Sequence, residues 1–396
     1  MRIKISRQMI KWCFLIVFLF PPNYVTRLSY ISWTFDGLSL MIGIFAIYIN
    51  YRRGVRIDRF VLTIILMQIW MFFSTLIHFA SITSGFKLFV RVVVICYLLS
   101  ELIEINATRT YNALNVVFHI YIIINTVTLF LFPNAMYLNV KGAPVCWFLG
   151  EDNYGFSYYL LANILALCHG DQKKSVVLPI FSVVLSVIFA WKNDIVTGKI
   201  CVIVMALFLL FGFFHKLRTW ISLYKITIFH LVLFYLLIFN RVFRKATLLF
   251  DMVGRNLTFS GRTIIWDLVL EEVSKKPVFG HGVYSANMFE DLLHLPGISS
   301  AHNYYLMIAF QGGIVALILF ACIIVVLSNN KTKTDNVIEF YLLTGIFIFM
   351  LREQFETGGY EFLYVIFVLY YHRNRFMDVY TAINDRGIVH DSKTIQ

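Results

Sequence analysis

The chain of 396 residues is 59% hydrophobic and only 14% charged, with a formal net charge of +12. Such a composition excludes an ordinary soluble domain. Apolar stretches of about twenty residues recur from end to end, and a helix of that length crosses a bilayer core of roughly 30 Å. We therefore expect an all-α membrane protein that crosses the bilayer many times.

The positive charge does not indicate nucleic acid. The lysines and arginines form short clusters beside apolar segments, and the chain has no RNA- or DNA-binding motif. Such clusters orient membrane proteins, because positively charged loops tend to stay in the cytoplasm. The six cysteines are scattered without a CxxC pair, so we expect small core residues rather than disulfides.

In chain order, the apolar segments predict a bundle of about twelve transmembrane helices. The first segment follows a basic N-terminus and has no small-residue cleavage site, so we expect an uncleaved helix rather than a signal peptide. The predicted spans are 10–27, 31–50, 60–80, 87–105, 113–133, 153–170, 175–191, 196–215, 220–240, 303–327, 336–352 and 360–372.

The basic clusters give these spans an orientation. They place the N- and C-termini in the cytoplasm and leave two external loops, 134–152 and 241–302. The second loop is itself basic, which suggests an anionic partner. The predicted organisation is helices 1–9 in 1–240, a large extracytoplasmic loop in 241–302, helices 10–12 in 303–372 and a cytoplasmic tail in 373–396.

The large loop between helices 9 and 10 predicts an amphipathic helix over 260–276. Ser260 is a plausible N-cap, and Pro277 ends the helix. Apolar residues recur at helical spacing on one face, so the helix would lie along the membrane surface or cap the bundle. These residues are Trp266, Val269, Leu270 and Val273.

Arg262 is unusual in this predicted helix. It lies in the first turn, where the helix dipole disfavours a cation. An anion bound at that end would be held by the backbone N–H groups and the guanidinium together. A surface arginine bonded to a loop carbonyl is the alternative interpretation.

Two histidines of the loop differ in their surroundings. His281 is flanked by Gly280 and Gly282, which permit a flexible turn or a close backbone approach, and we interpret this histidine as structural. His302 lies beside Asn303, where the polar loop enters the next apolar span. A histidine there can exchange protons with water while it rests against the bundle. The residues alone are equally consistent with a structural role for His302.

Further cations are predicted on the same side of the membrane. Lys199 lies near the outer end of the eighth span, and Lys141 lies in the first external loop. Lys87 and Arg91 share a helix face, four residues apart. Charges at this depth are often functional, but long side chains also reach lipid headgroups from there. Both interpretations stay open.

Several common catalytic motifs are missing from the chain. It has no Walker A sequence, no HExxH, no cysteine–histidine zinc spacing, no GxSxG and no DxD. An external reaction must then stabilise its leaving group with protein cations, and an activated lipid-linked donor fits a compartment without nucleotide energy. We expect no metal and no cofactor.

Three motifs occur in order in this part of the chain. They are Ser-Gly-Arg at 260–262 with Trp266, Pro-x-Phe-Gly-x-Gly at 277–282, and His-Asn-x-x-Leu at 302–306 with Gly312–Gly313 in the following helix. With about twelve helices and a large external loop between the ninth and tenth, the chain resembles the O-antigen ligase/polymerase superfamily. That family comprises multispanning membrane glycosyltransferases acting on undecaprenyl-diphosphate-linked sugars.

The resemblance implies that 241–302 is a catalytic loop. The loop arginine, here Arg262, would bind the donor diphosphate and stabilise its departure. The loop histidine, here His302, would assist deprotonation of the acceptor hydroxyl in a metal-independent, inverting transfer. Lys199 stands where ligases often carry an arginine. Besides Arg262 and His302, the expected diphosphate- or substrate-binding residues are Lys199, Lys141, Arg255, Asn303, Gly280 and Gly282.

Polymerases and ligases of this kind use the same donor and differ in the acceptor. The residues of the Ser-Gly-Arg and His-Asn motifs, together with Lys199, resemble those of capsular and exopolysaccharide polymerases. This resemblance implies a repeat-unit polymerase at the outer face of the cytoplasmic membrane. An O-antigen ligase that transfers glycan to lipid A-core is the alternative. A flippase is the alternative of another class, although it would carry polar residues at the bilayer midplane. The implied partners are undecaprenyl-diphosphate-linked oligosaccharide, membrane lipids and a chain-length regulator.

Overall fold

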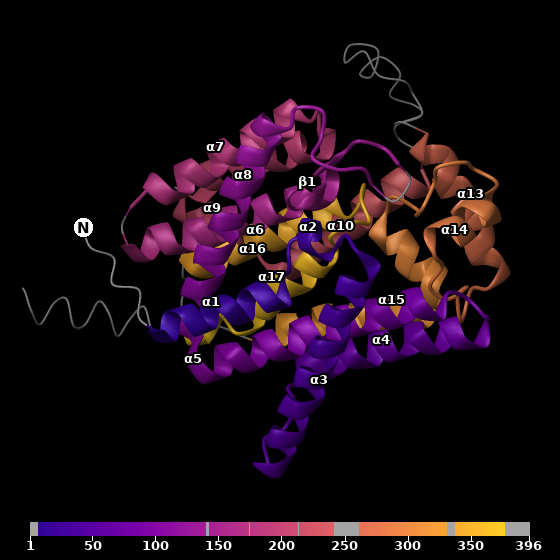
Figure 1. Ribbon diagram of the computed structural model, residues 1–396, viewed down its shortest axis with the longest axis horizontal. Coiled ribbons are helices and arrows are strands. Elements are labelled where there is room, and N and C mark those ends of the chain that lie inside the picture. Colours follow the sequence, from indigo (N-terminus) through magenta and orange to yellow (C-terminus); the bar gives the residue numbers. More distant parts are fainter. Residues whose placement is uncertain are drawn as a thin grey trace, which may run out of the picture.

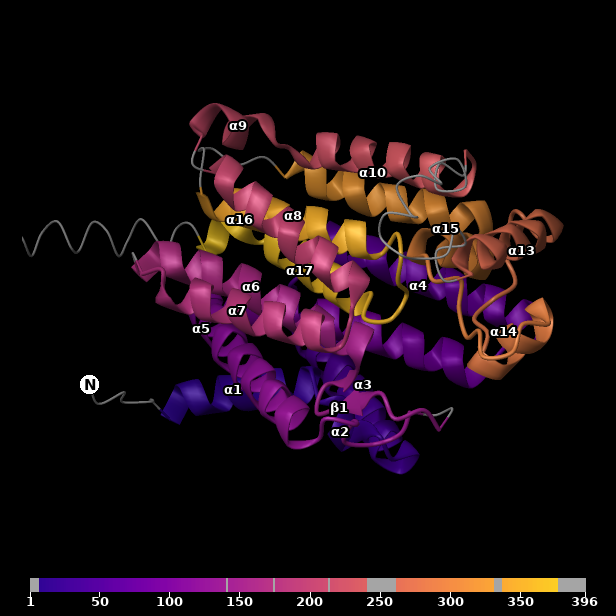
Figure 2. The ribbon, with the colours of Figure 1, turned by 90° about the horizontal axis from the view of Figure 1, so that it is seen from above.

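The computed structural model describes residues 7–139, 142–173, 175–212, 214–240, 261–330 and 337–376. Within these ranges the regular elements are helices, apart from two short antiparallel strands, so the predicted helical class is confirmed. Figure 1 shows the helices packed into one bundle, and Figure 2 shows α13 and α14 at one end of it.

The elements fall where the apolar segments predicted helices. Those of the first half are α1 (Arg7–Leu19), α2 (Asn23–Thr26), α3 (Ser29–Arg52), α4 (Arg59–Ile77), α5 (Ile82–Leu131), β1 (Cys146–Trp147), β2 (Gly150–Glu151), α6 (Asp152–Lys173) and α7 (Val177–Lys192). Those of the second half are α8 (Val196–Gly212), α9 (His215–Trp220), α10 (Leu223–Ile238), α13 (Arg262–Lys275), α14 (Ala286–Leu293), α15 (Tyr304–Asn329), α16 (Val337–Arg352) and α17 (Glu361–Tyr371).

Two predicted spans, 87–105 and 113–133, are parts of the single long element α5. The element is interrupted at Asn106, whose φ of −161° and ψ of 93° are not helical. The Asn106 side chain accepts a hydrogen bond from Arg109 N at 2.9 Å, as an N-cap does. Asn106, in the polar stretch between the two predicted spans, thus caps the second half of α5. No loop separates the two halves.

Three helices are long and apolar enough to cross a membrane by length and composition: α3, α4 and α15. Shorter apolar helices pack with them, among them α7, α8, α10 and α17. Only 6% of the most apolar window of α3 is buried, against 44% for α4 and 50% for α15. Most of the α3 surface is therefore left for lipid, and Figure 1 shows this helix projecting from the bundle. The predicted count of twelve crossings stays a prediction.

The glycine-rich segment Pro277–Val283 packs against α4 and against an interruption in α15 at Gly313. Gly282 N donates to the Gln311 carbonyl at 3.0 Å, so the segment pairs with the interrupted backbone. A Cβ at Gly280 would lie 2.6 Å from backbone atoms of α15, and one at Gly282 would lie 2.6 Å from backbone of α4. Both glycines have positive φ, 74° and 81°. Of the two roles predicted for these glycines, a flexible turn or a close backbone approach, the structure shows the close approach.

The amphipathic helix predicted over 260–276 is present as α13 and caps the bundle. Trp266 and Val269 are buried and belong to one apolar cluster with Phe289 of α14 and Phe310 of α15. The residue that precedes α13 is Gly261, with φ 81° and no side-chain cap bond. The predicted N-cap, Ser260, lies outside the described residues.

Candidate functional site

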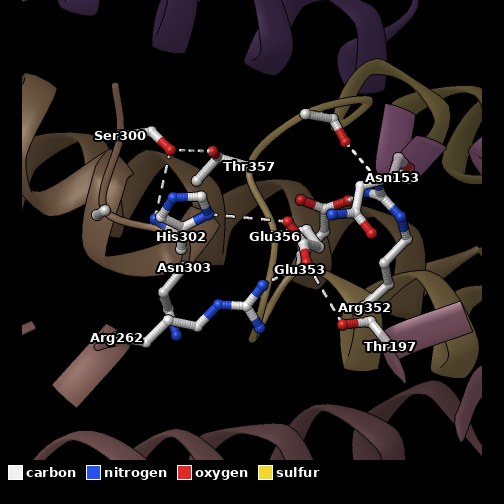
Figure 3. Close-up of polar contacts among 12 residues, drawn as sticks. Asn153, Thr197, Arg262, Ser300, His302, Asn303, Arg352, Glu353, Glu356 and Thr357 are labelled. Carbon is white, nitrogen blue, oxygen red and sulfur yellow. Dashed lines mark hydrogen bonds and ion pairs between the residues drawn. The ribbon is translucent and has the colours of Figure 1, made fainter. Parts of the chain in front are cut away.

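Arg262 and His302 meet at one carboxylate, that of Glu356. Arg262 Nη2 donates to Glu356 Oε1 at 2.7 Å, and His302 Nδ1 lies 3.8 Å from Glu356 Oε2. The three residues come from the start of α13, the segment before α15 and the loop between α16 and α17. Figure 3 shows the two basic side chains converging on the acid. The two residues that the sequence singled out therefore lie together, through a third that it did not single out.

The three side chains differ in their access to solvent. The exposed fraction is 6% for Glu356, 16% for Arg262 and 31% for His302. The imidazole is thus within reach of a molecule that enters the site, whereas the carboxylate is enclosed. Within the described residues, His302 Nε2 has no hydrogen-bond partner, so the ring nitrogen not facing Glu356 is available to accept a proton.

The position of His302 is fixed by its backbone neighbours. Trp266 Nε1 of α13 donates to the carbonyl of Ala301 at 3.0 Å, which ties Arg262's helix to the residue before His302. His302 itself has a φ of 48°, in the left-handed region that few non-glycine residues adopt. This backbone conformation turns the chain between Ala301 and the start of α15.

Asn303 links the histidine to the acidic loop. Its Oδ1 accepts from Leu306 N at 2.9 Å and so caps α15. Its Nδ2 donates to the carbonyl of Gln354 at 2.9 Å, and Tyr304 N donates to the carbonyl of Glu353 at 2.8 Å. Asn303 is completely buried. The contacts of this residue explain how the site is built, and its predicted role toward substrate stays a prediction.

The loop 353–360 is shaped by Arg352, at the end of α16. Arg352 Nη1 donates to Glu353 Oε1 at 2.7 Å, and Nη2 donates to the carbonyls of Asn153 and Gly358 at 2.7 and 2.5 Å. The Arg352 side chain is 1% exposed. A buried guanidinium with several acceptors fixes a loop more firmly than a surface ion pair does. Arg352 therefore holds the segment that presents Glu356.

The two acids of this loop have opposite pKa shifts. Burial opposes ionisation of Glu356, but His302, Arg262 and Arg352 outweigh it and lower the pKa of the Glu356 carboxyl group. Burial raises the pKa of Glu353 to about 8, in spite of the adjacent Arg352. Near neutral pH, Glu356 is thus a carboxylate between two basic groups. Glu353 pairs with Arg352 and serves the loop.

Lys199 belongs to a helix that borders the site. Thr197, two residues earlier on α8, donates to Glu356 Oε1 at 3.4 Å. Lys199 itself forms an ion pair with Asp194, and its Nζ lies 5.7 Å from the centre of the Trp191 ring. The helix that carries Lys199 therefore reaches the acid, and the diphosphate role of Lys199 stays a prediction.

The remaining predicted residues fall into two groups. Gly280 and Gly282 lie in the packed segment on α4 and α15 described above, and the structure brings neither to the carboxylate of Glu356. Lys141 and Arg255 lie outside the described residues. His281 is buried, stacks on Phe310 at 4.8 Å between ring centres and donates from Nε2 to the Glu272 carbonyl at 2.8 Å. These contacts agree with the structural role predicted for His281.

The sequence analysis missed the acidic partner. The run Arg352–Thr357 contains one arginine and two glutamates between two apolar spans, and it belongs to none of the three motifs described above. The feature that could have revealed it is the number of charged residues in a short connection between two helices, where uncharged turn residues are enough. Intramembrane or membrane-edge acids usually have a partner, and here the partners lie 94 and 54 positions earlier in the chain.

No group of three or more histidine, cysteine, aspartate or glutamate side chains in the described part of the chain is arranged to hold a metal ion. The predicted independence from metal stays a prediction.

One comparison with known proteins finds a similar family for part of the chain. Residues 159–321 match the family model described as O-antigen ligase. This part of the chain is therefore similar to the O-antigen ligase/polymerase superfamily. No curated protein and no solved structure matches the chain significantly.

The O-antigen ligase match includes Lys199, Arg262 and His302 but ends before the loop that carries Glu356. Members of this superfamily are membrane glycosyltransferase-like enzymes, and the apolar helices agree with a multi-pass membrane protein. Part of the site assembled here therefore comes from the matched domain, and its acid comes from the segment after it.

Proposed function

We propose that this O-antigen ligase/polymerase superfamily protein is a repeat-unit polymerase. It transfers a growing glycan from undecaprenyl diphosphate to a lipid-linked repeat unit at the outer face of the cytoplasmic membrane. The observation that carries this proposal is the convergence of Arg262 and His302 on Glu356 at one end of the bundle. A cation for the leaving group and a base for the acceptor are the two groups that such a transfer needs.

In the proposed reaction, the oxygen of an acceptor hydroxyl attacks the anomeric carbon of the donor sugar. The bond between that carbon and the diphosphate oxygen breaks on the opposite side, which inverts the anomeric configuration. The hydroxyl proton passes to His302 Nε2, and the electron pair of the broken bond leaves with the diphosphate. The reaction as written conserves atoms and electrons without any further reactant.

Arg262 is proposed to stabilise the departing diphosphate. A guanidinium always carries its charge and presents a planar set of donors that matches phosphate oxygens. The carboxylate of Glu356, 2.7 Å away, holds the guanidinium beside His302 before substrate binds. A group positioned in advance stabilises developing charge without reorganising during the reaction.

Glu356 is proposed to position the base. With a carboxylate near Nδ1, the proton of a neutral imidazole is favoured on that nitrogen, and Nε2 is left as the acceptor. Once the acceptor proton has been taken up, the same carboxylate stabilises the imidazolium. Glu356 thus acts through His302 and Arg262 and does not itself touch substrate.

Replacing Glu356 with Gln tests this positioning role. Gln keeps the shape and can accept from Arg262 but loses the charge, so we expect transfer to fall on the order of tenfold or more, as for loss of a charged hydrogen bond. Because the folded pKa is lowered, Glu356 stabilises the fold above its ordinary pKa of 4.5 and loses that contribution as the pH falls through the folded value. Thermal unfolding below pH 4.5 should therefore be less pH-dependent in the variant.

The matched control is Asp291→Asn, which removes an exposed carboxylate from α14 at the same end of the molecule. The control should leave both the rate of transfer and the pH dependence unchanged. An active Glu356→Gln protein with the wild-type pH dependence would contradict the positioning role.

The experiment that tests the proposed function is reconstitution of the purified protein in liposomes with an undecaprenyl-diphosphate-linked repeat unit as the sole substrate. A ladder of longer lipid-linked glycans is the expected product. Product that forms only after lipid A-core is added would make the protein a ligase instead. Movement of substrate across the bilayer without any new glycosidic bond would contradict the enzymatic proposal and favour the flippase alternative.

A further inference from the structure

A polar cavity of about 440 Å³ lies beside the Arg262–His302–Glu356 site. It is partly open and is lined by the segment around α2, the start of α3, the start of α5, the first turns of α15 and the loop 353–360. Its volume is in the range of small-molecule sites in proteins, roughly 300–1,000 Å³. The mechanism proposed above does not use this cavity.

Two cations line the cavity from one face of α5, Lys87 and Arg91. Lys87 Nζ lies 4.4 Å from the centre of the Trp33 ring, and Arg91 Nη1 lies 3.7 Å from Glu361 Oε1. In the described part of the chain, one acid, Asp36, lines the cavity. Snorkelling to lipid headgroups is one of the two interpretations given above for this pair, and both side chains also line this partly open cavity. Among the lining residues the two cations outnumber the one acid, with Arg91 also paired to Glu361, and such a lining favours an anionic group such as phosphate.

The rest of the lining has the chemistry that binds sugars. Hydroxyl and amide side chains surround the space and can donate or accept hydrogen bonds. Tyr304 and Tyr360 add two stacked rings with centres 5.0 Å apart. The polar lining residues without formal charge include Asn23, Thr26, Ser32, Ser84, Gln311 and Thr357.

The cavity and the site share a wall. Ser300 and Thr357 line the cavity, and their hydroxyl groups are 2.6 Å apart. Ser300 Oγ also accepts from His302 N at 3.4 Å, and Thr357 follows Glu356 directly in the chain. In Figure 3 this hydroxyl pair and Arg262 lie on opposite sides of the contact between His302 and Glu356. A substrate in the cavity would thus approach the base from the side away from Arg262.

We infer that this cavity binds the acceptor, as a sugar joined to a lipid phosphate or diphosphate. Lys87 and Arg91 hold the phosphate oxygens, and the hydroxyl and tyrosine lining holds the sugar. This inference rests on the proposed function, in which Arg262 binds the donor diphosphate. Two lipid-linked substrates then meet at His302 from opposite sides, each with its own cationic site.

The test separates the two substrates chemically. The donor probe is the undecaprenyl-diphosphate-linked repeat unit without its acceptor hydroxyl, so that it can only donate. The acceptor probe has a methylene group in place of the oxygen between sugar and diphosphate, so that it can only accept. Transfer kinetics with both probes, and binding of the acceptor probe alone, are measured for the full-length protein in lipid nanodiscs.

Lys87→Gln is the decisive variant, because Arg91 is tied to the buried Glu361 and its loss could disturb the fold. We expect the KM for the acceptor probe to rise about tenfold or more, as for loss of one charged hydrogen bond, with the KM for the donor probe unchanged. Lys87→Arg should largely restore the affinity. Lys192→Gln is the matched control, since Lys192 also lies over an aromatic ring but does not line the cavity.

Two results would overturn the inference. An unchanged acceptor KM and unchanged acceptor binding in Lys87→Gln would show that the cavity does not bind this substrate. A higher KM for the donor alone would assign the cavity to the other substrate. If the wild-type protein transfers no sugar at all, the proposed function fails, and binding of the acceptor probe to wild type and Lys87→Gln still decides whether the cavity is a site for phosphate-linked sugars.

Discussion

Arg262→Ala is expected to lower glycan transfer by roughly 100- to 1,000-fold, the usual effect of removing one group that stabilises transition-state charge. The guanidinium is held at the site by Glu356, and its loss removes the cation proposed for the departing diphosphate. Arg262→Lys should retain part of the activity, because lysine keeps the charge but not the planar set of donors. Transfer rates in proteoliposomes with the lipid-linked repeat unit measure both effects.

The control for Arg262 lies on the same helix. Lys275→Ala removes a cation from the last turn of α13, where Lys275 is 53% exposed and, among the described residues, pairs with two acids of its own helix, Glu271 and Glu272. This variant should transfer at the wild-type rate. Arg262→Ala protein that is folded, present in the membrane and still fully active would remove the basis for the proposed function.

His302→Asn is expected to lower transfer by about 100-fold or more, the usual contribution of a general base. Asparagine is preferable to alanine here, because His302 has a φ of 48° and asparagine tolerates the left-handed region. The backbone turn should therefore persist while the proton acceptor is lost. The remaining activity should rise with pH as hydroxide replaces the base, which a purely structural defect would not produce.

His294 provides a matched control for His302. It lies in the same part of the chain, is exposed and has a similar φ of 52°. His294→Asn makes the same chemical change in the same backbone conformation, and we expect normal transfer. Equal activity in the two variants would show that His302 carries no proton in the reaction, even if Arg262 proves essential.

The site was predictable from the sequence only in part. Arg262 and His302 stood out for two reasons. They lie in a long polar segment between apolar spans, which is unusual in so hydrophobic a chain, and their motifs resemble those of a known family. Glu356 carries no such motif, and neither does the segment around it. Its role follows from contacts with residues 94 and 54 positions away in the sequence, and local patterns do not report pairing over such separations.

The sequence by itself determined the helical membrane class, the positions of the apolar helices and the amphipathic helix that became α13. These features depend on hydrophobic length and periodicity, which are local properties of the chain. Only the tertiary structure decided that Gly280 and Gly282 pack against backbone, that the two halves of α5 join at Asn106 without a loop, and that Lys87 and Arg91 border a cavity. Each of these depends on which helix packs beside which, because burial and close approach are properties of the assembled bundle.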